Sequence, residues 1–192
     1  MQPAKDGHRG VCTFVRMKIV SLISDYRIIE SAKSGYWLSP ELNIVTDLHM
    51  FDELWNRVQM TVDEDTRRHL LKKAVELYKS GPVEIYSREL WFLPTVAHYS
   101  FRYAGAVNQL MEMLDQSGDY ISILEYANSA RKNLPENPDV LYWLVRPMRK
   151  LGMGEMARNE LRAAREILRE EDHRDLMRRL DKQRRTLTMF QY

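Results

Sequence analysis

The sequence predicts a mainly α fold in which antiparallel helical hairpins follow one short helix and a β-hairpin. Two observations support this prediction. From Phe51 onward, apolar residues recur at helical spacing through most of the chain. Before that point, a shorter helical stripe is followed by two β-like segments around a turn that contains glycine. We therefore expect a small mixed segment and a larger helical one.

The sequence of the helical segment repeats weakly at a spacing of 34 residues. Five pairs of like residues stand at this spacing: Leu110 and Leu144, Gly118 and Gly152, Ala130 and Ala164, Arg131 and Arg165, and Leu134 and Leu168. This period is typical of tetratricopeptide repeats (TPRs), whose helical hairpins stack on one another. Such a stack offers its remaining surface to partners and rarely forms a catalytic pocket of its own.

The N-terminal segment is predicted to hold one helix and one hairpin. Residues 1–10 are polar and are expected to be a disordered lead-in. Residues 12–24 carry apolar side chains at helical spacing. The β-like segments 27–30 and 36–38 flank a turn, where Gly35 can supply a positive φ. A winged helix ends in this order, and we assign residues 11–46 to a partial winged helix with its connector.

Residues 47–192 are assigned to the TPR-like domain, which begins with two helices. The first is expected to start with Asp47 as its N-cap and the second with the acidic residues 63–65. Gly81-Pro82 then breaks the pattern, and residues 83–93 are expected to form a loop. The inward residues of the two helices are predicted to be Phe51, Leu54, Trp55 and Val58, then Leu70, Leu71, Ala74, Leu77 and Tyr78.

Five further helices are predicted: residues 95–116, a partner beginning at Asp119, a helix capped by Asn137, then 155–169 and 173–185. Pro147 lies inside the third and should bend it. Their inward residues are expected to be Tyr99, Tyr103, Ala106, Val107, Leu110, Met111 and Leu114; Tyr120, Ile123, Leu124, Ala127 and Ala130; Leu141, Leu144, Val145, Met148 and Leu151; Met156, Ala157, Leu161, Ala164 and Leu168; and Leu176, Leu180 and Leu187.

Composition indicates a soluble cytoplasmic protein. The net charge is +2 over 192 residues. Residues 1–37 hold six bases and three acids, whereas the remainder holds 23 bases and 24 acids. The N-terminal segment is therefore the better candidate for contact with an anion. Cys12 is alone, and the sequence contains neither a signal peptide nor an apolar run long enough to cross a membrane.

The sequence offers no catalytic pattern, and we expect neither an enzyme nor a bound cofactor. The five histidines are scattered without the spacing of metal ligands. The turn at residues 152–154 lacks the preceding strand that a phosphate-binding loop requires, and no nucleophile elbow is present.

Three groups of residues allow both a structural and a functional interpretation. Trp55, Trp91, Trp143, Tyr99 and Tyr103 are expected in the core, with a groove for a peptide or small effector as the alternative. The basic run at residues 178–185 is expected to be a solvated helix face, with nucleic-acid contact as the alternative. DNA contact is predicted for a third group, on the N-terminal helix and hairpin: Thr13, Arg16, Lys18, Arg27 and Lys33.

Residues 34–170 resemble a known family of bacterial regulators. The resemblance lies in Ser34-Gly35-Tyr36-Trp37-Leu38-Ser39-Pro40, Thr46-Asp47, Phe51-Asp52-Glu53-Leu54-Trp55, Leu70 to Lys79, Trp91 to Pro94, Gly118-Asp119-Tyr120 and Leu144 to Leu151. It is to transcription regulators of the antibiotic regulatory protein (SARP) type. The resemblance implies a helical bacterial transcriptional activator domain that supports homodimerisation and contacts the transcription machinery, and a winged helix that binds DNA.

The N-terminus departs from this family pattern. Residues 11–38 resemble only the recognition helix and wing, and the ten residues before them do not resemble the preceding helices of a complete winged helix. DNA binding by this chain is therefore expected to be weak or lost. Our hypothesis is a transcriptional regulator that contacts protein partners, and the alternative is an interaction or effector-sensing module without a DNA role.

Overall fold

The computed structural model describes residues 29–32, 35–39, 45–79 and 90–189. The chain divides into two units, residues 1–45 and 46–192. The described residues are mainly helical, as predicted. The predicted helix at 12–24 and most of the predicted loop at 83–93 lie outside the described residues.

The first unit contains the predicted β-hairpin. Strands β1 (Ile29–Ala32) and β2 (Gly35–Leu38) pair antiparallel, with Glu30 opposite Trp37. The indole Nε1 of Trp37 donates a hydrogen bond to Oε2 of Glu30 over 3.0 Å, which fastens this cross-strand pair. Gly35 has a φ of +143°, a conformation that other residues rarely adopt, so its predicted role at the turn is confirmed.

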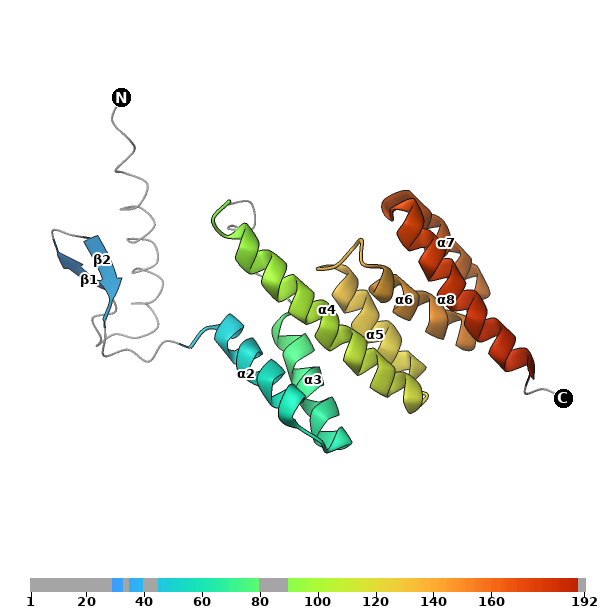
Figure 1. Ribbon diagram of the computed structural model, residues 1–192, viewed down its shortest axis with the longest axis horizontal. Coiled ribbons are helices and arrows are strands. Elements are labelled where there is room, and N and C mark those ends of the chain that lie inside the picture. The colour runs from blue at the N-terminus through green and yellow to red at the C-terminus, as the bar shows by residue number, and fades with distance from the viewer. Residues whose placement is uncertain (1–28, 33–34, 40–44, 80–89, 190–192) are drawn as a thin grey trace, which may run out of the picture. The chain divides into compact units, whose positions relative to one another are not determined.

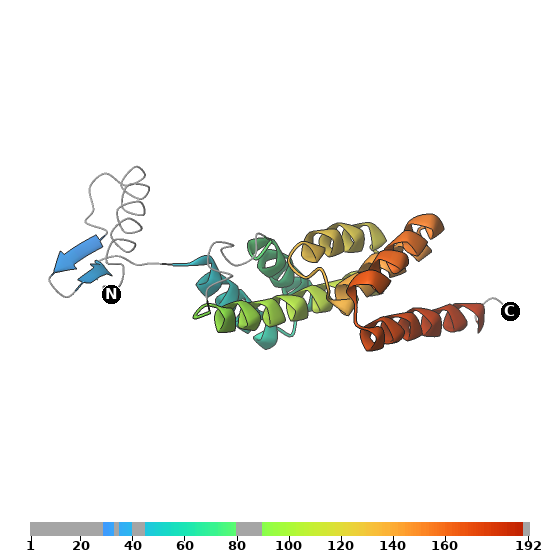
Figure 2. The same cartoon turned by 90° about the horizontal axis from the view of Figure 1, so that it is seen from above.

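The second unit contains seven described helices: α2 (Asp47–Met60), α3 (Glu64–Leu77), α4 (Leu93–Gln116), α5 (Tyr120–Arg131), α6 (Pro138–Lys150), α7 (Gly154–Ile167) and α8 (Glu170–Met189). Successive helices pack on one another from α2 to α8 (Figure 1). Among the even-numbered helices, α4 also packs on α2 and α6, and α6 packs on α8. Seen from above, α4 and α8 lie along one side of the unit and α3 and α5 along the other (Figure 2).

The backbone hydrogen bonds that end α4 and α6 coincide when the chain is shifted by 34 residues. After α4, the amides of residues 117, 118 and 119 donate to the carbonyls of residues 113, 115 and 114. After α6, the amides of residues 151, 152 and 153 donate to the carbonyls of residues 147, 149 and 148. Gly118 and Gly152 supply the left-handed conformation at each turn, with φ of +72° and +75°. The spacing read from the sequence thus recurs in the backbone.

One hydrophobic core runs through the helical unit. Leu110 and Leu144, which are equivalent at the 34-residue spacing, are both fully buried, and so are Ala130 and Ala164. Most of the predicted inward residues belong to this core. Two predictions were wrong, because Leu151 and Met156 are 41% and 53% exposed. Leu151 lies where α6 turns toward α7, and Met156 lies on a flank of α7.

Several helix ends differ from the sequence prediction. The N-cap of α2 is Thr46, whose side chain accepts a hydrogen bond from the amide of His49 over 3.1 Å, and the predicted cap Asp47 lies in the first turn. Helix α4 begins at Leu93 because Pro94 fits its first turn, and α8 extends over residues 170–189. The predicted caps Asp119 and Asn137 are confirmed.

Asn133 joins the second hairpin to the first. Its Nδ2 donates to the backbone carbonyls of Tyr78 and Lys79 over 3.2 and 3.1 Å. These carbonyls follow α3, where the helix can no longer supply amide donors. The side chain thereby stabilises the end of a helix 54 residues earlier in the chain.

Candidate protein-binding face

The even-numbered helices present an exposed face centred on α4. Residues 101, 105, 108 and 112 recur at three- and four-residue spacing, so they share one side of α4, opposite its buried residues. Helix α2 flanks this side at one edge and α6 flanks it at the other. We call this surface the front face, defined by Trp55, Phe101, Gly105, Asn108 and Glu112 and bordered by the buried Trp143. Four of these residues lie on α4, which is labelled in Figure 1.

Gly105 allows an aromatic ring to approach the backbone of α4. A Cβ atom at this position would lie 3.2 Å from Cη2 of Trp55, which is tighter than most contacts of real Cβ atoms. A glycine inside a helix costs about 1 kcal/mol relative to alanine. Here the missing side chain lets the half-buried indole of Trp55 lie against the helix. This contact forms the edge of the front face next to α2.

A polar chain crosses the other edge of the front face. The Nε1 of Trp143 on α6 donates to Oδ1 of Asn108 on α4 over 2.7 Å. The Nδ2 of Asn108 in turn donates to Oε1 of Glu112 over 3.1 Å. A side-chain amide has two N–H donors and two acceptor lone pairs, so Asn108 retains one donor and one lone pair for a ligand. The exposed Glu112 carboxylate lies next to it.

Ion pairs between arginine and aspartate join each even-numbered helix to the next. Arg102 on α4 binds Asp52 on α2, and Arg146 on α6 binds Asp115 on α4 through two N–H groups. A two-point arginine–carboxylate contact fixes the relative orientation of the groups that carry it. These pairs align the helices that form the front face.

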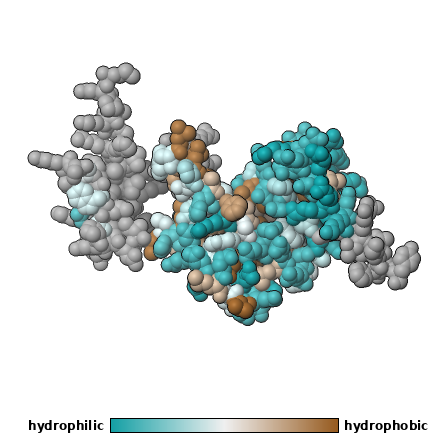
Figure 3. All heavy atoms as spheres, in the orientation of Figure 1, coloured by the Kyte–Doolittle hydropathy of each residue, from teal (hydrophilic) through white to brown (hydrophobic). Residues whose placement is uncertain are grey.

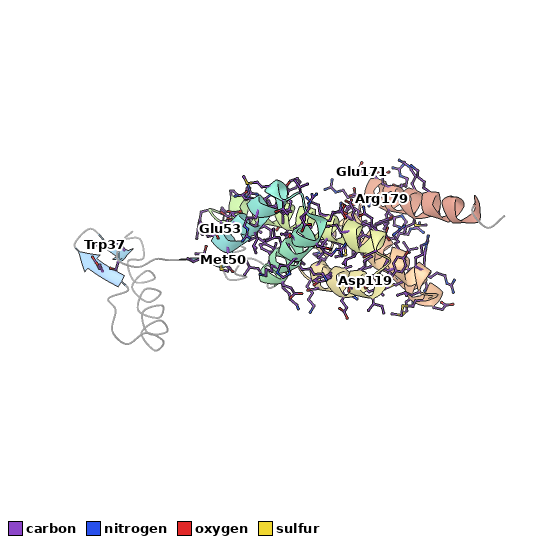
Figure 4. All side chains as sticks on the ribbon, turned by 90° about the horizontal axis from the view of Figure 1, so that it is seen from below. Trp37, Met50, Glu53, Asp119, Glu171 and Arg179 are labelled. Carbon is purple, nitrogen blue, oxygen red and sulfur yellow. The ribbon has the colours of Figure 1, made fainter. Side chains whose placement is uncertain are left out.

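The third of these pairs joins α6 to α8. Arg179 on α8, labelled in Figure 4, binds Asp139 on α6. Its Cζ lies 4.2 Å from the ring centroid of Tyr142. Arg149 donates to the backbone carbonyl of Leu180 on the same interface, over 3.5 Å. Thus Arg179 joins two helices, which corrects its predicted placement on a solvated helix face.

A hydrogen bond also joins Tyr99 to the first ion pair. Its hydroxyl donates to Oδ2 of Asp52 over 2.7 Å. Burial and then the hydrogen bond to the ionised carboxylate raise the pKa of Tyr99 to about 12. The phenol is therefore protonated at neutral pH and acts as a donor to Asp52, with no role as a base.

An apolar strip begins just before α4 and continues along its first turns. We define it by Leu90, Trp91, Leu93 and Phe101, all of which are exposed. Phe101 is 82% exposed and Trp91 is 68% exposed. Figure 3 shows apolar side chains gathered where α4 begins. Exposed apolar groups that cluster on one surface mark contact sites more often than isolated ones do.

The aromatic residues singled out from the sequence have different surroundings. Tyr103 and Trp143 are buried, which confirms the prediction of core packing for them. Trp55 and Tyr99 are half-buried against the core, and Trp91 is exposed, so core packing was wrong for Trp91. The most exposed aromatic ring of the described residues, Phe101, was not predicted, although its position opposite the apolar stripe of α4 was a usable signal.

The predicted DNA-contacting residues Thr13, Arg16, Lys18, Arg27 and Lys33 lie outside the described residues. The same applies to the side chains of Arg184, Arg185 and Leu187. The hairpin that would carry Lys33 is described on both sides of it, and Trp37 on this hairpin is labelled in Figure 4.

Within the described part of the chain, no cluster of three or more histidine, cysteine or acidic residues is placed to hold a metal ion. No helix in that part has the length and apolar character needed to span a bilayer. Comparison with known proteins gave no match to any family model, curated protein or solved structure.

Proposed function

We propose that the chain is a transcriptional regulator whose helical unit is a TPR-like activator domain that binds a protein partner. The recurrence of the same backbone hydrogen bonds at residues 113–119 and 147–153 is the observation that carries this proposal. It supports our interpretation of two successive hairpins as equivalent units that stack through their apolar sides. Repeats of this kind leave an extended surface free, and they commonly use it for protein recognition.

The front face is the surface that we assign to the partner. The apolar strip, which adjoins the front face and shares Phe101 with it, contains two exposed aromatic rings, and aromatic residues supply much of the binding energy in protein interfaces. Along the same helix, Asn108 and Glu112 supply polar groups that can fix the direction of a bound segment. The surface therefore fits a protein segment that is apolar at one end and carries hydrogen-bond donors at the other.

The DNA-binding part of the proposal concerns residues 11–38. A hairpin at residues 29–38 is consistent with the wing of a partial winged helix, and Lys33 falls between its strands. The positive charge of residues 1–37 supports contact with phosphate groups. This role remains a proposal that rests on the sequence resemblance and on the hairpin.

Purified bacterial RNA polymerase is the probe that tests the protein-binding role. Biolayer interferometry with the immobilised full chain should detect binding, and Phe101→Ser should weaken it by about tenfold or more. Ile121→Ser is the matched control, because Ile121 is also exposed on a helix but lies outside the front face. Absence of binding, or equal weakening by both substitutions, would overturn the assignment of the front face to this partner.

Fluorescence anisotropy with duplex DNA separates the regulator from the alternative, an interaction or effector-sensing module. A regulator should bind DNA with an affinity that falls as salt increases, and Arg16→Ala or Lys33→Ala should reduce the salt dependence. If the full chain binds polymerase but no duplex, the protein is an interaction module without a DNA role.

A further inference from the structure

Three arginines form a stripe along α7. Arg158, Arg162 and Arg165 follow one another at spacings of four and three residues, which places them on one side of the helix. All three are exposed. Arg158 pairs with Glu155 one turn earlier. We call this surface the arginine stripe.

The repeat indicates what kind of group the stripe faces. Arg165 is equivalent to Arg131 at the 34-residue spacing. Arg131 on α5 binds Glu160 on α7, with 2.5 Å between Nη1 and Oε2. An arginine at this repeat position thus pairs with a carboxylate on the next odd-numbered helix. In the described residues, α7 packs mainly on α6 and only slightly on α8, so its arginine side is open to another molecule.

The stripe also differs from the equivalent surface of α5. Arg158 and Arg162 correspond at the same spacing to Leu124 and Asn128. Leu124 packs against the core, and Asn128 is an exposed neutral residue. An apolar and a neutral position are therefore replaced by two cations on α7. This change suits a partner with carboxylates better than it suits a further copy of the same hairpin.

We propose that the arginine stripe docks an acidic α-helix of a protein partner. Glutamates spaced by four and three residues on the partner would face the three guanidinium groups. A helical partner is favoured over nucleic acid because Glu155 and Glu166 on α7 border the stripe. The continuous negative charge of a phosphate backbone would be repelled by these carboxylates. An acidic helix presents its carboxylates in one narrow row, so they can face the arginines alone. This site is separate from the front face and does not depend on polymerase binding.

Two synthetic peptides test the proposal with the full chain. Both are alanine-based helices of roughly four turns with three glutamates, either aligned at the spacing of the stripe or scattered around the helix. Fluorescence anisotropy at low salt should show the aligned peptide binding about tenfold more tightly than the scattered one. Equal affinities for the two peptides would overturn the proposal, because charge alone would then explain the binding.

Substitutions locate the binding surface. The double variants R162E/R165E and R162Q/R165Q should each weaken binding of the aligned peptide by about tenfold, and the second avoids new repulsion. The control K73E/K132E makes the same change in net charge at two exposed lysines on α3 and after α5, and it should retain the affinity. Circular dichroism of each variant confirms that the helices persist.

Three further outcomes would contradict the proposal. Equal weakening of peptide binding by K73E/K132E and R162E/R165E would indicate a general charge effect. If the full chain bound random-sequence duplex DNA more tightly than the aligned peptide, and if R162E/R165E abolished this DNA binding, the stripe would be a nucleic-acid site. If analytical sedimentation showed that the full chain is a dimer, and that R162E/R165E is a monomer, the stripe would bind a second copy of the chain.

Discussion

Replacing Gly152 by alanine should destabilise the helical unit by about 1 kcal/mol. The residue has a φ of +75°, and the left-handed conformation costs a residue with a Cβ about 1–2 kcal/mol. Alanine also lowers the entropy of the unfolded chain, which offsets about 0.4–1 kcal/mol of this cost. No atom lies within 4 Å of the position that the new Cβ would take, so steric contact adds nothing. The net loss therefore reports the backbone conformation alone.

Gly118→Ala should have the same effect, which makes the pair informative. Its φ is +72°, its surroundings are equally open, and its hydrogen bond to residue 115 matches that of Gly152 to residue 149. The two turns share no partner, so the double variant should lose about 2 kcal/mol. Asparagine tolerates the left-handed conformation, and Gly152→Asn should recover most of the loss.

Urea denaturation followed by circular dichroism measures these differences. In thermal unfolding, each single substitution should lower the melting temperature by roughly 2–4 °C for a unit of this size. The reasoning would be refuted if Gly152→Ala were neutral or stabilising. It would also be refuted if the two alanine variants differed by more than about 1 kcal/mol, because equivalent turns cannot differ so much.

Four further predictions concern the helical unit. Leu144→Ala should cost about 2–5 kcal/mol in urea denaturation because it leaves a cavity in the core, and a loss below 1 kcal/mol would contradict its burial. Asn133→Ala should cost about 1–2 kcal/mol through two lost hydrogen bonds, whereas the exposed Asn128→Ala should change little. Pro147→Ala should be neutral or stabilising, and a large loss would indicate that the proline inside α6 shapes a required surface. Hydrogen bonds from residue 122 lower the pKa of Asp119 below its ordinary value of 3.8. The stabilisation of the fold by this carboxylate is therefore present above pH 3.8 and is lost as the pH falls through the lowered pKa. Asp119→Asn should remove this acid sensitivity from melting curves and keep the cap.

The helical hairpins were predictable because their signals are local. Asp119 and Asn137 combine capping chemistry with apolar stripes on either side, and both have the predicted roles. The cap of α2 was misplaced by one residue, since Thr46 and Asp47 are both good capping residues and only the backbone conformation selects between them.

Contacts between helices were harder to predict. The pairing of Asp52 with Arg102, or of Asp139 with Arg179, depends on which helices become neighbours across 40 residues or more. The exposure of Trp91 was equally hard to predict, because aromatic residues are usually buried. The exposure of Phe101 could have been predicted from its position opposite the apolar stripe of α4. By contrast, the four-residue and three-residue spacing of the arginine stripe is visible in the sequence.

A double-mutant cycle on Arg146 and Asp115 tests most directly whether the helical hairpins stack on one another. This largely buried pair joins α6 to α4, which belong to successive hairpins. Stacking predicts a coupling free energy of about 1–3 kcal/mol from urea denaturation of wild type, Arg146→Met, Asp115→Asn and the double variant. A coupling below about 0.3 kcal/mol would show that the two hairpins do not meet there, and it would contradict the arrangement on which the front face depends.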